Sequence, residues 1–200
     1  MADPAPQLVP AADRSSRHLK ILYHHRTRSR DGQSIHIDEL IRALATAGHT
    51  IIMVEPKRVP ATQQSLNRRL LPQPVYELLE FGYSVLEFAK LASAAIRHRP
   101  DALYERGNVF MLSGVWTAAL FNLPFLLEVN APLAAERGKF GGLSLPWLAA
   151  WTERCTWRSA DRVLPVTGVL ARDIEKAGVP RARIVVTPNG VDLDELQPID

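Results

Sequence analysis

Residues 28–50, RSRDGQSIHIDELIRALATAGHT, follow the apolar run LKILYHH of residues 19–25, and together these two segments decide the fold. Asp31-Gly32 favours a tight turn, and Ser34 is of a residue type that caps helix starts. The apolar residues after this turn recur at helical spacing: Ile37, Leu40, Ile41 and Leu44. Gly48 provides a left-handed stop for that helix. The stretch therefore predicts a strand, a glycine turn and an amphipathic helix.

Five further segments resemble the opening strand. Short apolar runs of strand type occur at residues 20–25, 50–55, 101–105, 125–129, 161–167 and 183–188, and amphipathic segments lie between most of them. Strands that alternate with helices are typical of an α/β protein with a parallel sheet. We therefore expect a mainly parallel sheet with helices on both faces.

Composition limits the classes of function. The chain has 200 residues, of which 46% are hydrophobic, enough for one sizeable core. Its net charge of +3 favours anionic small molecules or an acidic membrane surface as partners, and does not suggest a dedicated nucleic-acid binder. The single cysteine, Cys155, excludes an internal disulfide and fits a reducing cytoplasm. We expect a cytoplasmic protein, with peripheral contact at the inner face of the membrane as an open alternative.

Two segments resemble targeting or membrane sequences. Residues 1–18 are rich in proline, alanine and charge and lack a continuous apolar core, so we interpret them as a disordered leader and not as a signal peptide or an anchor. Residues 109–127 carry no charge, but Gly114, Asn122 and Pro124 interrupt them. A buried helix followed by a buried strand is therefore favoured over a membrane span.

Two apolar stripes are expected on later helices. The longer one runs through Leu78, Leu79, Val85, Leu86, Ala89, Ala92 and Ile96, with Gly82 as a candidate bend. Packing on the sheet is the favoured interpretation of this stripe, and contact with a membrane that carries a lipid acceptor is the alternative. The second stripe, Trp147, Trp151 and Cys155, follows a helix start at Pro146 and predicts core packing rather than a ligand platform.

The loops after the strands are where parallel sheets bind ligands, and the opening loop is the first candidate. Backbone N–H groups at the start of its helix suit a phosphate, and Arg26, Arg28 and Arg30 add positive charge. The loop lacks the glycine fingerprint of dinucleotide sites, so an ordinary exposed loop remains the alternative. His24 and His25 point to opposite faces of the strand, so we predict no metal site there.

Two other strand ends carry polar residues. In YERGN, Tyr104 and Arg106 share one face while Glu105 points to the other; in EVNAPLAAERGKFGG, Glu128 and Asn130 emerge together before a flexible glycine-containing loop. If the two strands are neighbours, we expect Arg106 to pair with Glu128 and to hold Asn130 over the crevice. A purely structural ion pair is the alternative.

The order of these pieces carries a resemblance. A strand, a glycine turn, the helix HIDELIRALATAGHTI, then ADRVLPVTGVLARDI and finally PNGVD resemble the N-terminal half of retaining family four glycosyltransferases of the GT-B fold. The likeness covers residues 19–195. It implies a Rossmann-like, doubly wound domain that forms one half of a GT-B enzyme, with residues 196–200 beginning the linker to a donor domain that this chain lacks.

The resemblance also implies roles for individual residues. Many family members place a histidine near the reacting sugar after the fourth strand, and the matching residue here is Asn130, which can hydrogen-bond a hydroxyl but cannot shuttle a proton. The remaining implied sites are donor-phosphate binding by Asp31, Gly32, Gln33 and Ser34, acceptor binding by Arg28, Arg106, Glu128 and Lys139, and a hinge or cleft position for Asn189 and Gly190. The family's first loop normally reads Gly-Gly, so Asp31 makes Gly32 the better candidate for phosphate contact.

The function implied is the acceptor-binding half of a glycosyltransferase of hexosyltransferase type. It would use a nucleotide-diphosphate sugar as co-substrate with retention of configuration, and no other cofactor or metal. The donor domain would come in cis or as a separate chain, and the isolated chain would be inactive. The alternatives are a non-catalytic α/β module that binds an anion or a protein partner, and a sugar-nucleotide epimerase of the same two-domain fold.

Overall fold

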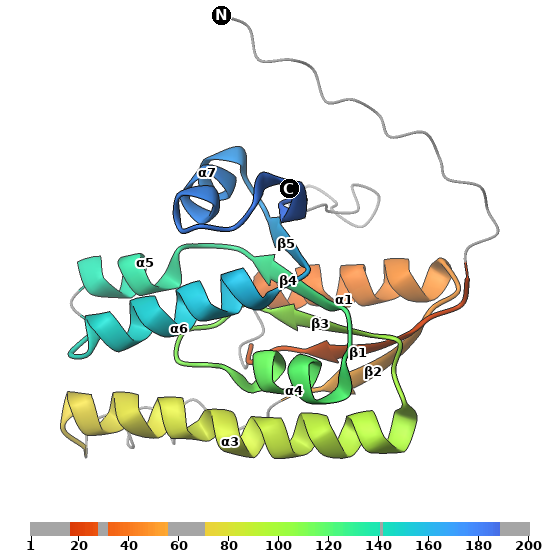
Figure 1. Ribbon diagram of the computed structural model, residues 1–200, viewed down its shortest axis with the longest axis horizontal. Coiled ribbons are helices and arrows are strands. Elements are labelled where there is room, and N and C mark those ends of the chain that lie inside the picture. The colour runs from red at the N-terminus through yellow and green to blue at the C-terminus, as the bar shows by residue number, and fades with distance from the viewer. Residues whose placement is uncertain (1–16, 28–31, 56–70, 141, 189–200) are drawn as a thin grey trace, which may run out of the picture.

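Five parallel strands form a single sheet in the computed structural model, which describes residues 17–27, 32–55, 71–140 and 142–188 (Figure 1). The strands are β1 (Lys20–His24), β2 (Thr50–Val54), β3 (Ala102–Arg106), β4 (Phe125–Val129) and β5 (Arg162–Pro165). Their order across the sheet is β2-β1-β3-β4-β5, and each neighbouring pair is parallel. The direction of winding reverses between β1 and β3, which is the switch point at which such sheets bind ligands.

The predicted sixth strand at residues 183–188 is wrong as a regular strand. Its first residue belongs to the 3₁₀ turn η1 (Arg181–Arg183), and only Ile184 makes a parallel bridge, to Val163 of β5. The next residues follow β5 through backbone bonds of 2.9 Å from Val185 N–H to Val163 O and from Thr187 N–H to Pro165 O. The segment thus extends the sheet edge without a full ladder.

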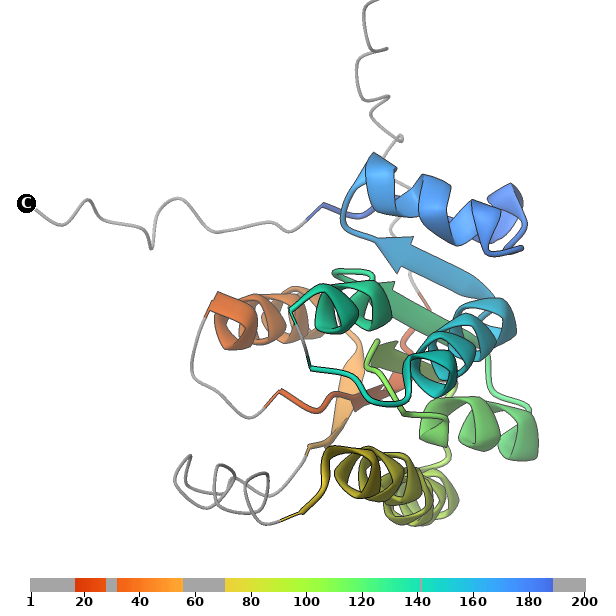
Figure 2. The ribbon, with the colours of Figure 1, turned by 90° about the vertical axis from the view of Figure 1, so that its left-hand side faces the viewer.

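Helices cover both faces of the sheet. They are α1 (Gly32–Thr46), α3 (Gln73–His98), α4 (Ser113–Phe121), α5 (Leu133–Lys139), α6 (Pro146–Ser159) and α7 (Gly168–Lys176). In Figure 2 α1 lies on one side of the sheet, with α4 and α6 on the other. Alternate side chains of β1 follow this division, because Ile21 and Tyr23 pack with Ile37 of α1 while Leu22 packs with Leu91 of α3. The predicted α/β architecture is confirmed.

The uncharged run 109–127 divides at Pro124 as predicted, into α4 and the buried strand β4. Within the described ranges, no helix combines the length and apolar character needed to cross a bilayer. The segment that follows β4 differs from the prediction. It contains α5 where a flexible loop was expected, since Leu133, Ala134, Ala135, Glu136 and Arg137 are all good helix formers.

The core assignment of both apolar stripes is wrong. On α3 the residues of the stripe face outward, with Leu79 58% and Ile96 67% exposed, and the helix runs unbroken through Gly82. On α6 Trp147 is 66% and Trp151 46% exposed, although the helix does begin at Pro146. Other residues bury these helices: Glu77, Ser84, Glu87, Leu91 and Ala95 on α3, and Leu148, Ala149, Thr152, Thr156 and Trp157 on α6.

A buried ionic cluster joins α3 to the sheet. His24 is fully buried, and its two ring nitrogens lie 2.6 Å from Glu105 Oε2 and 3.3 Å from Glu87 Oε2. Glu87 also accepts a 2.7 Å hydrogen bond from Lys90 Nζ. Burial would lower the pKa of His24, but the hydrogen bonds and charges of Glu105 and Glu87 outweigh it and raise that pKa to about 9. His24 is therefore an imidazolium that links β1, β3 and α3.

Glycine at position 114 makes room for this cluster. A Cβ atom added to Gly114 would overlap the buried carboxylate of Glu105, which cannot withdraw because His24 holds it. We expect Gly114→Ala to lower the free energy of unfolding by about 1–3 kcal/mol, the usual cost of overpacking. Urea unfolding followed by circular dichroism measures this change.

Gly82→Ala is the matched control for that substitution. Gly82 lies inside α3 with nothing within 4 Å of the added Cβ. We expect it to stabilise the protein by about 0.5–1 kcal/mol, because alanine is the better helix former. Equal effects of the two substitutions would show that Gly114 does not accommodate Glu105.

Candidate functional site

A cavity of about 550 Å³ opens at the carboxyl ends of the central strands, at the switch point of the sheet. Its walls come from the segments after β1, β3 and β4 and from α5 and α6. The polar side chains in these walls include Arg26, Arg106, Asn108, Asn130, Glu136 and Glu153, and the larger apolar ones are Leu127, Val129, Leu133 and Trp157. Such a mixture suits a ligand that presents hydroxyl groups together with an apolar ring face.

Glu128 is the centre of the polar network beside this cavity. Its carboxylate accepts hydrogen bonds from Arg106 Nη1 at 2.5 Å, Asn130 Nδ2 at 2.6 Å and Tyr104 Oη at 3.1 Å. His36 of α1 lies 3.7 Å from the same carboxylate. Arg106 and Glu128 are 8% and 3% exposed, so this is a buried, charge-assisted cluster. The predicted pairing of Arg106 with Glu128 is confirmed.

Asn130 is oriented by this cluster. Because its amide nitrogen must donate to the Glu128 carboxylate, its amide oxygen points away from that partner. Within the described part of the chain this oxygen is buried and has no hydrogen-bond partner. Asn130 also lines the cavity. A residue of the cavity wall therefore carries an acceptor atom whose hydrogen-bonding capacity is unmet.

Two stacked tyrosines adjoin this network. The rings of Tyr23 and Tyr104 lie 5.1 Å apart with an interplanar angle of 16°. Burial, followed by the negative charge of Glu128, raises the pKa of both phenols well above the usual range. Both side chains therefore stay protonated, and Tyr104 serves as a hydrogen-bond donor to Glu128.

Glu153 is a residue of the cavity that was not predicted from the sequence. This carboxyl lines the cavity from α6 and accepts a 3.2 Å hydrogen bond from the backbone N–H of Ala134. Burial raises its pKa to about 7, although the N–H groups of Ala134 and Leu133 oppose the shift. Its sequence neighbourhood gives no signal, because a glutamate in the middle of a helix is usually solvated.

The two adjacent histidines point to opposite faces as predicted. His24 enters the α3 side, whereas His25 packs near Tyr23 and lies 3.8 Å from Glu55. Burial lowers the pKa of His25. No group of three potential metal ligands gathers anywhere in the described ranges.

The remaining predicted site residues are only partly described. Gly32 is the first residue of α1, and Gln33 and Ser34 belong to its first turn. The side chains of Gln33 and Ser34 lie outside the described part of the structure. Lys139 is the exposed last residue of α5 and does not line the cavity. Arg28, Asp31, Asn189 and Gly190 lie outside the described residues, as do most of the predicted leader and all of the predicted linker. Their roles stay predictions.

A parallel 2-1-3-4-5 sheet with a polar cavity at its switch point defines a Rossmann-like domain of the kind that forms one half of GT-B enzymes. The sequence profile of Glycosyltransferase Family 4 matches residues 30–195. The chain therefore belongs to glycosyltransferase family 4.

Solved structures of similar fold agree with the Rossmann-like architecture. A co-structure of MnaA from S. aureus with UDP superposes with a TM-score of 0.59 at 17% identity, covering 86% of this chain and 45% of that chain. The UDP-GlcNAc 2-epimerase from Methanocaldococcus jannaschii gives a TM-score of 0.59 at 13% identity, with 86% and 46% covered. HepE from Anabaena, in complex with UDP-glucose, gives 0.56 at 17% identity, with 88% and 45% covered.

The chain spans about half the length of the solved structures that it matches. At identities this low the likeness shows the fold alone. No curated protein sequence matches the chain.

Proposed function

We propose that this chain is the acceptor-binding half of a glycosyltransferase that moves a hexose from a nucleotide-diphosphate sugar to an acceptor hydroxyl. The observation that carries the proposal is that Asn130 lines a cavity at the switch point of a family 4 domain and that its buried amide oxygen has no hydrogen-bond partner among the described residues. Structures of similar fold were determined with UDP or UDP-glucose, which supports a nucleotide sugar as co-substrate.

The role proposed for Asn130 is orientation of the acceptor. Its amide oxygen would accept a hydrogen bond from a hydroxyl of the acceptor, while Glu128 fixes the amide plane. An amide cannot remove a proton at neutral pH. We propose that transfer retains anomeric configuration and that the leaving diphosphate helps to deprotonate the acceptor. The domain then contributes mainly by positioning the acceptor, and such positioning can account for a large share of catalysis.

The donor phosphates are proposed to lie at the start of α1. Gly32 is the first residue of this 15-residue helix, and backbone N–H groups of a first turn suit an anion. A second domain, in cis or as a separate chain, would hold the rest of the nucleotide sugar, so we expect the isolated chain to be inactive. No metal or further cofactor is part of this proposal.

Asn130→Ala tests the proposed function directly. We expect kcat/KM for sugar transfer by the assembled enzyme to fall about ten-fold, since one hydrogen bond of about 1.4 kcal/mol to the acceptor is lost. Initial rates with a panel of nucleotide sugars and acceptors measure the change. Retention is read from the configuration of the product.

Asn108→Ala is the matched control. Asn108 lines the same cavity, but its side-chain oxygen already accepts a 2.8 Å hydrogen bond from the N–H of Val109. We expect a smaller loss from this substitution. Equal losses would remove the special role of Asn130, and binding of nucleotide sugar without any transfer would favour the non-catalytic module instead.

A further inference from the structure

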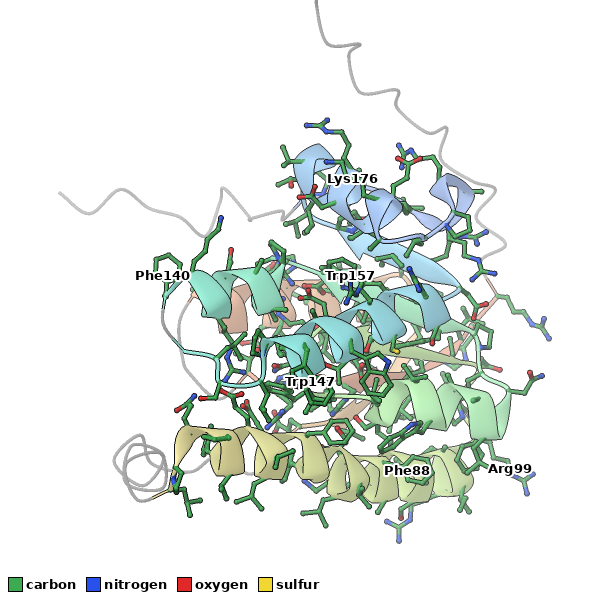
Figure 3. All side chains as sticks on the ribbon, turned by 60° about the vertical axis from the view of Figure 1, so that its left-hand side comes forward. Phe88, Arg99, Phe140, Trp147, Trp157 and Lys176 are labelled. Carbon is green, nitrogen blue, oxygen red and sulfur yellow. The ribbon has the colours of Figure 1, made fainter. Side chains whose placement is uncertain are left out.

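Helix α3 departs from the usual amphipathic pattern, because it buries polar residues and exposes aliphatic ones. The face that packs against the domain carries the buried polar residues Glu77, Ser84 and Glu87. The outward face carries an aliphatic stripe, with these exposed fractions: Val75 42%, Leu78 53%, Leu79 58%, Val85 57%, Leu86 58% and Ile96 67%. At 1.5 Å per residue this stripe is about 32 Å long. Figure 3 shows Phe88 on the α4 side of the helix and other side chains projecting from the opposite side.

The inward orientation of the carboxylates is fixed by partners in the domain. Glu77 accepts hydrogen bonds from the backbone N–H groups of Ser144 at 2.8 Å and Leu145 at 2.7 Å. Glu80 lies 3.0 Å from Arg137, and Glu87 binds His24. Rotating α3 to bury the aliphatic stripe would break all of these contacts. The exposure of the stripe is therefore built into the packing of α3.

The outward face of α3 is also uniform in charge. All three of its carboxylates are turned inward, and Lys90 pairs with one of them, Glu87; Arg97 and the C-cap residue Arg99 are exposed. A second copy packed in parallel against this face would bring like charges together, which disfavours that arrangement. An anionic partner suits the face better.

Exposed aromatic residues continue the apolar surface beyond α3. Trp151 of α6 makes an edge contact with Phe81 of α3, with ring centroids 6.4 Å apart. Trp147, one turn earlier on α6, is 66% exposed, and Phe140 in the preceding loop is 87% exposed. Aromatic rings of this kind are favoured at the interface between lipid and water.

We propose that α3 docks the domain onto an anionic lipid surface. The aliphatic stripe would lie in the interface plane, and Arg97 and Arg99 would face lipid phosphates. The stripe lies on the convex outer side of a helix, and the cavity of about 440 Å³ beside α3 is lined by Tyr76 and Glu80 and not by the stripe, so a bilayer fits the stripe better than an acidic protein does. This inference does not depend on the proposed transfer reaction.

Vesicle co-sedimentation of the 200-residue chain tests the proposal. The probes are vesicles of phosphatidylcholine alone, and vesicles in which one third of the lipid is phosphatidylglycerol. We expect binding to the anionic vesicles at low salt, little binding to the neutral ones, and release at high salt. No binding at low salt would overturn the proposal.

Val85→Glu and Val169→Glu form a matched pair for this experiment. Val169 is 62% exposed on α7, which packs on β5 at the sheet edge opposite β2. We expect Val85→Glu to weaken partition into the vesicles by about ten-fold or more, because a charge replaces an aliphatic group that the lipid would bury. Val169→Glu should bind like the unaltered chain.

Leu79→Glu, on the same stripe, serves as a second variant in case Val85→Glu folds poorly. Equal losses from the α3 and α7 variants would contradict the proposal. The proposal would also be contradicted if the chain formed a concentration-dependent dimer and did not bind vesicles. If Val85→Glu abolished that dimer, the stripe would be assigned to contact with a second copy of the chain.

Discussion

Replacing His24 by leucine is expected to lower the free energy of unfolding by about 3–5 kcal/mol, the usual cost of breaking a buried ionic cluster from one side. His24 is the positive group between Glu87 and Glu105, and all three side chains are almost fully buried. Without it, Lys90 remains for Glu87, but no cation contacts Glu105 in the described structure. Leucine has a similar volume, so the loss comes from charge rather than from a cavity.

The pH dependence of stability gives a second measure of the same cluster. The pKa of His24 is about 9 in the folded state against about 6.5 in an unfolded chain, so its contribution is complete below pH 6.5 and is lost as the pH rises through 9. Burial opposes ionisation of Glu87, but hydrogen bonds from His24 and Lys90 lower its pKa to about 2, so its contribution is present above about pH 4.5 and is lost as the pH falls through 2.

Urea unfolding between pH 6 and 10 measures the contribution of His24. In the unaltered chain the free energy of unfolding should fall across this range, and His24→Leu should flatten the curve. His98→Leu is the control, because His98 is the exposed last residue of α3 and should change stability by less than about 0.5 kcal/mol. A loss below about 1 kcal/mol in His24→Leu would mean that the imidazolium is not the partner of the two carboxylates.

Glu128→Ala is the other substitution with a large expected effect. It leaves the Arg106 guanidinium, only 8% exposed, without its carboxylate, and it releases the donors of Asn130 and Tyr104. We expect a loss of about 3–5 kcal/mol in the free energy of unfolding. Because Asn130 is no longer held, sugar transfer by the assembled enzyme should fall at least as far as in Asn130→Ala.

A double-mutant cycle distinguishes the ion pair from simple loss of packing. If Arg106 is destabilising only when unpaired, Arg106→Met together with Glu128→Ala should lose less than the sum of the two single substitutions. Glu175→Ala, at an exposed position of α7, controls for loss of a carboxylate and should stay within about 0.5 kcal/mol. Strict additivity would contradict direct coupling of Arg106 to Glu128.

Alternation along strands was the most informative part of the sequence. It predicted that His24 and His25 separate and that Arg106 meets Glu128, because the two-residue period of a strand determines the face of each side chain once the neighbouring strand is known. The parallel sheet followed from the spacing of the apolar runs. Only the sixth run failed to form a regular strand: its first residue belongs to the 3₁₀ turn η1, and Ile184 alone makes a bridge to β5.

Helical periodicity was less informative, as α3 illustrates. It located the stripe that contains Leu79 and Leu86 but not the side on which the stripe lies. Glu77, Ser84 and Glu87 share a face with equal regularity, and their partners in the loop before α6 and on β1 are distant in sequence. Glu153 was missed for a similar reason, since its burial depends on α5, which was itself predicted to be a loop.

The ionic cluster of His24 also couples the position of α3 to that of the cavity. It fastens α3 to β1 and β3, and Arg26, directly beyond β1, rests over the ring of Tyr83 on the same helix at 5.0 Å. The helix and the cavity wall therefore belong to one rigid body. A surface that binds α3 would therefore also limit how far the rest of the domain can tilt. The mouth of the cavity would then stay at a nearly constant height above that surface.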